Sequence, residues 1–340
     1  MTLFSCVLKG KTTSEDQFAR FLKSYNRALQ CCSPETIRVK TYFFLNSDAA
    51  EKAVKGVMKG EDYIILRRDD DPGELRNEFL ARMQTVVLKE KSYFTFFDGD
   101  DEIVYDYFCQ DYRSIDGHGF AIGNPYAVYG TSESDFYPLK WCLVAANDDI
   151  HHATMMDYKG CQSWGNIYEM DVAKIARFGR GLFEDVTFMY SVVDKYRNPV
   201  LFWNMVYLWH RDNANAMTRT SSSVAQILDG MDNLDTAESI ALRSYKSVLY
   251  PEVYRRYTIG CLTLIRNAVK TKEKDRALNT IFNRMDREAF NLREIEESDP
   301  KLMAKIREEF KGFDELMRKE GFIDVSASED CTVRPREAGS

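Results

Sequence analysis

Three carboxylates surround one glycine at the end of an apolar segment, and these residue types at this spacing could hold a cation. Residues 93–101 read YFTFFDGDD and supply Asp98, Asp100 and Asp101. Carboxylates gathered at a strand end typically bind a hard cation such as Mg²⁺ or Mn²⁺, whose remaining ligands are often phosphate oxygens of a substrate. The pattern therefore predicts a nucleotide or sugar-nucleotide site, with a solvated acidic turn as the alternative.

A second acidic pair, Glu184 and Asp185, opens the segment FEDVTFMYSVVDKY. Val186, Met189 and Val193 recur at helical spacing, so the pair is expected in the first turn of an amphipathic helix. The helix macrodipole favours carboxylates there and is expected to keep them ionised, as a general base requires at neutral pH. Helix capping is the alternative role for the pair.

Strand and helix periodicities alternate in the first half of the chain. The expected elements, in chain order, are a strand at 3–8, a helix at 18–29, strands at 39–45 and 63–66, a helix at 75–87 and a strand at 93–97. This order predicts an α/β sheet whose ligands bind beyond the carboxyl ends of the strands, where Asp98 lies. Residues 110–150 predict an irregular or antiparallel insertion, and the chain from about 235 is expected to be helical.

Length and composition limit the class of protein. The 340 residues, 44% of them hydrophobic, are enough for one large domain and a smaller one. The net charge of -7 argues against nonspecific coating of nucleic acid, although it allows a local basic groove. Eight cysteines without a CxxC pair favour a reduced, cytoplasmic chain. No signal peptide or transmembrane segment is expected, because the most apolar run, VLFWNMVYLW, is about half a membrane span.

An ordered series of segments between residues 70 and 220 resembles the family-two glycosyltransferases with the GT-A fold, which build bacterial surface polysaccharides. The segments are GELRN at 73–77, FDGDD at 97–101, WGNIY at 164–168, Glu184-Asp185, and WHR at 209–211 continuing to NAMT at 215–218. The FDGDD segment resembles the aspartate-any-aspartate motif of the family, and Glu184-Asp185 resembles its catalytic acid pair. The resemblance implies a GT-A, Rossmann-like domain with a mixed central sheet at 1–222. An all-helical C-terminal region at 223–322 and a disordered tail at 323–340 are expected to follow.

The resemblance also implies a reaction and the residues that perform it. A sugar would move from a nucleotide-sugar donor to an acceptor hydroxyl with inversion, Asp98 and Asp100 holding Mn²⁺ or Mg²⁺. Asp185 would act as the general base, with Glu184 beside it. The implied donor-binding residues are Arg76, Asn77, Asp98, Asp100, Asp101, Trp164, His210 and Arg211. Each of three residues also has a structural alternative: Arg76 as a salt-bridge partner of the aspartates, Trp164 as a core anchor and His210 as a surface cation.

Several positions depart from the pattern of the family. Residues 9–11 read KGK where the family has a proline-threonine-tyrosine-asparagine turn, and residues 46–48 read NSD where it has paired aspartates that hold the nucleobase. Asn166 and Ala216 replace the usual lysine and serine. The resemblance therefore assigns no base-binding residue, and Asp48 and the run at 69–71 are both candidates.

Three hypotheses follow for the function. The leading one is a metal-dependent inverting glycosyltransferase acting on a glycan or glycolipid. The alternative is a phage-type enzyme that glycosylates a hydroxymethylated DNA base, favoured by nine basic against three acidic residues at 255–287. The third is a non-catalytic sugar-nucleotide-binding or assembly module. The apolar faces of the C-terminal helices, which include Ile259, Leu262 and Ile265, are expected to pack on the first domain or to form a homo-oligomer.

Overall fold

The computed structural model describes residues 1–33, 35, 37–60, 62–86, 90–129, 136–138, 162–211, 222–245, 250–287 and 290–323. The strands are β1 (Thr2–Lys9), β2 (Arg38–Leu45), β3 (Tyr63–Arg67), β4 (Ser92–Asp98), β5 (Glu102–Ile103), β6 (Phe120–Val128), β7 (Phe136–Pro138), β8 (Ile167–Glu169) and β9 (Val200–His210). The helices are α1 (Glu15–Cys31), α2 (Asp48–Val57), α3 (Pro72–Thr85), η1 (Tyr112–Ile115), α6 (Val172–Ile175), α7 (Glu184–Lys195), α8 (Val224–Tyr245), α9 (Tyr250–Val269), α10 (Lys274–Arg284), α11 (Leu292–Ser298), α12 (Pro300–Glu309) and α13 (Phe313–Lys319).

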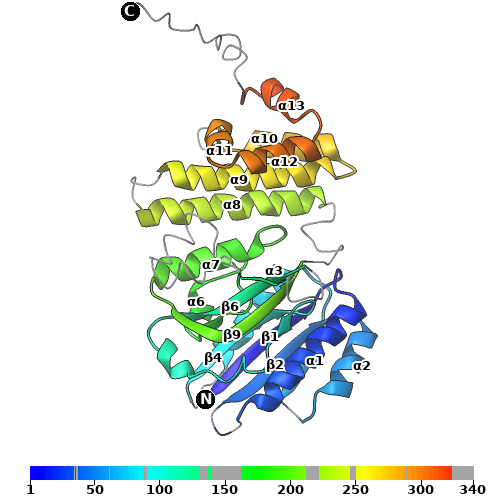
Figure 1. Ribbon diagram of the computed structural model, residues 1–340, viewed down its shortest axis with the longest axis vertical. Helices are drawn as coiled ribbons and strands as arrows, with labels where there is room; N and C mark the ends of the chain where they lie inside the picture. The colour runs from blue at the N-terminus through cyan, green and yellow to red at the C-terminus, as the bar shows by residue number, and fades with distance from the viewer. Residues whose placement is uncertain are drawn as a thin grey trace, which may run out of the picture.

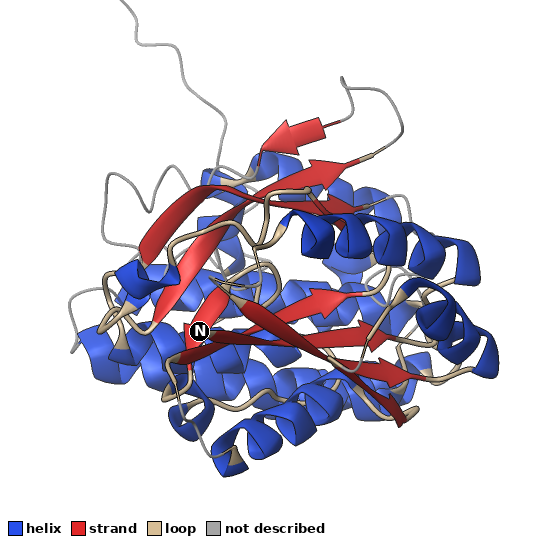
Figure 2. Cartoon of the chain, turned by 90° about the horizontal axis from the view of Figure 1, so that it is seen from below, coloured by secondary structure: helices blue, strands red, loops and turns tan. Residues whose placement is uncertain are grey.

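A mixed sheet forms the centre of the first domain, with helices on both of its faces (Figures 1 and 2). The strand order is β3-β2-β1-β4-β8-β6-β9-β5, and β7 pairs with β6. Strands β3, β2, β1 and β4 are parallel, whereas β8 is antiparallel to β4. Because Leu8 of β1 pairs with Asp98 of β4, the carboxyl ends of these two strands lie side by side. The structure thus confirms the mixed α/β sheet and places Asp98 at the carboxyl edge of its parallel strands.

The structure contains every strand and helix expected in the first half of the chain and adds α2 between β2 and β3. The sequence analysis passed directly from one strand to the next, but neighbouring parallel strands need a crossover segment. Ser47 caps α2 by accepting a hydrogen bond from the Ala50 N–H. Only two of its residues, Ala50 and Val54, are buried, so its hydrophobic signal was short.

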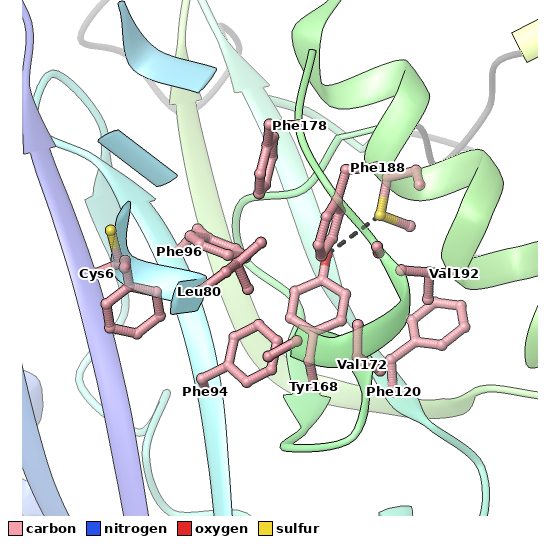
Figure 3. Close-up of a cluster of buried hydrophobic side chains, with 14 of the residues drawn as sticks. Cys6, Leu80, Phe94, Phe96, Phe120, Tyr168, Val172, Phe178, Phe188 and Val192 are labelled. Atoms are coloured by element: carbon pink, nitrogen blue, oxygen red, sulfur yellow. Dashed lines mark hydrogen bonds between the residues drawn. The ribbon is translucent and has the colours of Figure 1, made fainter. Parts of the chain in front are cut away.

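Aromatic side chains fill the core on both faces of the sheet. Under α1, Tyr25 packs edge-on against Phe43 and Phe97. On the opposite face, Phe96 and Tyr168 pack against Phe188 of α7 (Figure 3). The Tyr168 hydroxyl lies 3.2 Å from the sulfur of Met189. Each fully buried aromatic ring contributes about 2 to 3 kcal/mol of hydrophobic stabilisation, so this core fixes α7 firmly on the sheet.

The C-terminal helices form a layer on the first domain, with α8 between α7 and α9 (Figure 1). Ala237, Ile240 and Ala241 of α8 join the core that lies under α7. Helices α9 to α13 share a second core with the other face of α8. At Gly260 a Cβ would lie 2.6 Å from Leu234, so α9 and α8 approach closely because this residue has no side chain. The layer therefore packs on the sheet domain as a continuous structure.

Across the described part of the chain, no helix combines the length and the apolarity that a membrane crossing requires.

Candidate active site

A pocket of about 470 Å³ lies at the carboxyl ends of β1, β3 and β4. Its walls come from residues 10–13 after β1 and 69–71 after β3, and Asp98 and Asp100 line it at the end of β4. Glu184, the first residue of α7, also faces this space. The structure thus brings the two acidic motifs of the sequence, which are separated by more than eighty positions, into one cavity.

Gly99 determines where the two pocket aspartates lie. Its N–H donates to the Leu8 carbonyl at 2.7 Å. A Cβ at this position would lie 2.8 Å from the same oxygen and 2.9 Å from the ring of Phe18. The turn can approach β1 and α1 this closely only with glycine at its centre. Arg20 of α1 fixes the next residue by donating to the Asp100 carbonyl at 2.8 Å.

Asp101 points away from the pocket and anchors the turn to β9. Its carboxylate accepts hydrogen bonds from the Tyr207 hydroxyl at 2.7 Å and from the His210 backbone N–H at 2.8 Å. Burial raises its pKa well above the usual range, and the nearby Asp100 and Asp98 add to that shift. Tyr207 also accepts from the Asp98 N–H at 3.2 Å. Asp101 therefore positions the pocket aspartates, and it is absent from the described lining.

Three further predicted donor-binding residues lie beside this turn but outside the described lining of the pocket. The His210 imidazole lies 2.8 Å from a Glu102 carboxylate oxygen and is nearly buried. Trp164 stacks on the Tyr207 ring at 4.5 Å between centroids, which is the core-anchor arrangement. The Arg211 guanidinium lies 4.5 Å above the ring of Trp209. Residues 215–218, the end of the motif series, lie outside the described residues.

Arg76 joins the two acidic motifs. Its guanidinium donates to Asp98 at 2.6 Å and to Glu184 at 2.8 Å, and its carbon lies 5.3 Å from the ring centroid of Phe178. The residue is only 3% exposed, and burial alone would lower its pKa. The charges of Asp98, Glu184 and Asp185 outweigh that effect and raise the pKa, so Arg76 stays a cation. Both predicted roles are therefore compatible, since Arg76 pairs with the acids and lines the pocket.

The loop before α7 is held by three polar side chains, two from α3 and its N-cap and one from α8. Asn77 of α3 exchanges two hydrogen bonds of 2.9 Å with the backbone of Phe178. Asp71, the N-cap of α3, accepts from the Gly181 N–H at 3.0 Å. Asn233 of α8 donates to the carbonyls of Arg180 and Leu182, each at 2.7 Å. Asn77 thus contributes to the site by holding the backbone of this loop. The hydrogen bonds from all three side chains determine where the helix that carries Glu184 and Asp185 begins.

The first turn of α7 carries backbone strain and perturbed acids. Phe183, which precedes it, has a φ of 62°, a left-handed value that is uncommon for a residue other than glycine. Burial raises the pKa of Glu184 against the opposing effect of Arg76. Burial and the charge of Glu184 raise the pKa of Asp185 to about 8. The expectation that the helix end keeps both acids ionised is therefore wrong for Asp185, because desolvation outweighs the macrodipole.

The charges of the pocket suit a bound divalent cation. Six carboxylates line it against two cationic residues, Lys11 and Arg76. A diphosphate entering alone would meet a pocket wall of net negative charge. A divalent cation would bridge the carboxylate oxygens of the pocket and the oxygens of the diphosphate. Within the described residues, no group of three or more His, Cys, Asp or Glu side chains forms a complete metal site. Asp98 and Asp100 therefore fit a cation that takes its other ligands from a substrate, as Mg²⁺ commonly does.

Sequence reasoning missed several residues that build this site. Lys9 is buried, and its ammonium donates to the Thr13 carbonyl at 3.1 Å and to Asn46 at 3.2 Å, which fixes the 10–13 wall. Gln226 of α8 lines the pocket from the helical region. A polar residue closing an apolar strand was the only signal for Lys9. No local pattern marked Asn233, because its partners lie far away in the sequence. Gln226 exchanges hydrogen bonds with Ser223, a local capping pattern that indicates a helix start and says nothing of the pocket.

The strand order, the acidic strand end and the pocket together define a GT-A fold. A scan against protein-family models and a search of curated proteins give no match. Among solved structures, the chain is similar to S. aureus TarS 1-349 in complex with UDP, with a TM-score of 0.58 and 13% identity over 94% of this chain and 92% of that one. The complex of the same TarS fragment with UDP-GlcNAc gives a TM-score of 0.53 and 12% identity, over 86% and 93% of the two chains. At this identity the likeness is one of fold.

Proposed function

We propose that this protein is an inverting, metal-dependent glycosyltransferase that moves a sugar from a nucleoside-diphosphate donor to an acceptor hydroxyl. The observation that carries the proposal is the convergence of Asp98, Asp100, Arg76 and Glu184 on one pocket at the carboxyl edge of a GT-A sheet. The UDP and UDP-GlcNAc bound by the TarS structures of the same fold support a nucleotide-sugar donor.

The residues of the pocket would bind the donor, and Asp185, next to the lining residue Glu184, would act on the acceptor. Asp98 and Asp100 would hold Mn²⁺ or Mg²⁺, which when bound offsets negative charge on the departing diphosphate. Arg76 keeps Asp98 and Glu184 in fixed positions and adds a permanent positive charge beside the donor. Asp185 would accept the proton of the attacking hydroxyl. Its raised pKa suits that role, because an efficient general base has a pKa near the working pH.

A glycan or glycolipid acceptor fits the charges better than DNA does. Three of the nine basic residues at 255–287 form ion pairs within the described structure. Arg266 pairs with Glu309, Arg276 with Glu273, and Arg284 with Asp232. With a net charge of -7, the chain would bind a polyanion weakly at physiological salt.

A thermal-shift screen of sugar nucleotides tests the proposal. A donor that binds the folded state raises the melting temperature. At a donor concentration of one hundred times its Kd, the free energy of unfolding rises by about 2.7 kcal/mol. At least one UDP- or GDP-sugar should do so, more strongly with Mn²⁺ than without it. If no sugar nucleotide shifts the transition with either metal, the proposal fails. Salt-sensitive binding to duplex DNA would instead favour the modified-base acceptor.

A further inference from the structure

A second pocket, of about 590 Å³, lies at the opposite edge of the sheet and contains two exposed thiols. Met1, which precedes β1, lines this pocket, whereas the carboxylate pocket begins at the other end of β1. Cys31, the last residue of α1, and Cys109, which follows β5, both line it. The proposed transfer reaction uses neither cysteine.

These two cysteines are in contact. The sulfur of Cys109 lies 3.4 Å from the Cys31 carbonyl oxygen. The neighbouring Cys32 directs its sulfur to the Ile37 carbonyl at 3.7 Å, on the lining of a different pocket. The other described cysteines, Cys6 and Cys261, are fully buried in the cores. Among the described cysteines, Cys31 and Cys109 are the exposed ones, and the Cys109 sulfur lies against the backbone of Cys31.

We propose that Cys31 and Cys109 form a reversible disulfide when the protein meets a peroxide. One thiolate attacks an oxygen of hydrogen peroxide, the O–O bond breaks, and a sulfenic acid and hydroxide form. The hydroxide takes the proton that left the thiol and becomes water. The second thiol then attacks the sulfenic sulfur, so that the S–S bond forms and the hydroxyl group leaves with that thiol's proton as a second water. Two electrons pass from the sulfurs to the peroxide.

The rate of this oxidation should increase with pH. Burial raises the pKa of the Cys109 thiol, and the nearby Cys31 and Asp106 add to the shift. Since the thiolate is the reacting form, little of it is present at neutral pH. The pair is thus a modification site that responds to sustained oxidant, and it is unsuited to rapid peroxide removal.

The disulfide would connect the far end of α1 to the segment that leaves the acidic turn. The two residues are 78 positions apart, and the loop between them contains β2, β3 and β4. Residues of α1 already hold that segment, because Arg20 pairs with Glu102 and the Ser24 hydroxyl accepts from the Ile103 N–H. A cross-link over so long a loop restricts the unfolded chain, so the melting temperature should rise by about 5 to 10 °C.

Oxidation of the full chain tests the proposal without any assay of sugar transfer. The protein is treated with hydrogen peroxide at pH 7 and pH 8.5, free thiols are alkylated, and the digest is analysed by mass spectrometry without reductant. We expect a peptide linking Cys31 to Cys109, formed faster at pH 8.5, and a higher melting temperature that dithiothreitol reverses.

Matched serine variants separate this pair from its neighbour. Cys31→Ser and Cys109→Ser should each lose the cross-linked peptide and the melting shift, whereas Cys32→Ser should keep both. All three positions are at least partly exposed, so the variants should fold. Linkage of Cys109 to Cys32, oxidation only to sulfinic acid, or a melting shift that persists in Cys31→Ser would overturn the proposal.

Discussion

Replacing Arg76 with methionine removes the guanidinium that joins the two acidic motifs. Methionine keeps much of the length of the side chain but leaves Asp98 and Glu184 without their common partner. Removing one member of a buried ion pair typically costs about 3 to 5 kcal/mol. Because the Asp98 side chain is 26% exposed, we expect a loss near the lower limit, about 3 kcal/mol at pH 8. For a chain of this size that loss lowers the melting temperature by about 6 °C.

The stability lost in Arg76→Met should depend on pH, and the neighbouring acids Glu184 and Asp185 determine the direction of that dependence. Burial raises the folded pKa of Glu184 and Asp185 above the unfolded value of about 4. A carboxyl of this kind contributes stability that is fully present below pH 4 and is lost as the pH rises through the folded pKa, about 8 for Asp185. Without Arg76 these pKa values rise further. The variant should therefore lose about 3 kcal/mol at pH 8 but only about 1 kcal/mol at pH 5, where protonated Asp185 no longer repels its neighbours.

Urea denaturation of wild type and Arg76→Met at pH 5 and pH 8 measures this difference. Arg68→Met is a matched control, because Arg68 pairs with Glu78 while 42% exposed, and an exposed pair contributes at most about 1 kcal/mol. The reasoning would be refuted if Arg76→Met lost no more free energy of unfolding than Arg68→Met. A larger loss at pH 5 than at pH 8 would refute it as well.

Four further substitutions test the parts that position the site and its proposed general base. Gly99→Ala should cost about 1 to 3 kcal/mol in urea denaturation, because its Cβ would meet the Leu8 carbonyl; unchanged stability would mean that the turn has room. Asn233→Ala should cost about 2 kcal/mol, since two backbone carbonyls lose their donor, and normal stability would show that water replaces it. Asp185→Asn should reduce transfer by about 10² to 10⁴ and keep donor binding in calorimetry, whereas Glu184→Gln should lose less. Wild-type transfer rises with pH up to about 8 if Asp185 is the base, and a flat profile contradicts that assignment.

Local patterns in the sequence were sufficient to predict much of the fold. The strand that ends at Asp98 is a continuous apolar run and the helix that begins at Glu184 has clear helical periodicity, and both have the expected bounds within a few residues. Helix α8 begins at Val224, earlier than the expected start near 235, although Ile227, Met231 and Leu234 of its first turns are buried at helical spacing. The missed helix α2 shows a limit of sequence patterns, since a short helix with small apolar residues leaves little hydrophobic pattern.

The site was less accessible to sequence reasoning, because side-chain direction depends on packing. Asp100 and Asp101 are adjacent, yet one lines the pocket and the other binds Tyr207 in the interior. Glu184 and Asp185 differ in the same way, since only Glu184 is among the described pocket-lining residues. The pKa of Asp185 depends on burial beneath other segments, and no motif encodes that burial.

Release of nucleoside diphosphate from a panel of UDP- and GDP-sugars is the most direct test of the proposed activity. Wild type should release it in the presence of Mn²⁺ or Mg²⁺, and release should stop when the metal is chelated. Without the cation, nothing at the two carboxylates offsets the negative charge of the leaving group. Asp100→Ala should be inactive yet as stable as wild type, since Asp100 lines an open pocket at a strand end. Release by Asp100→Ala at the wild-type rate, or no release by wild type from any donor with either metal, would contradict the account.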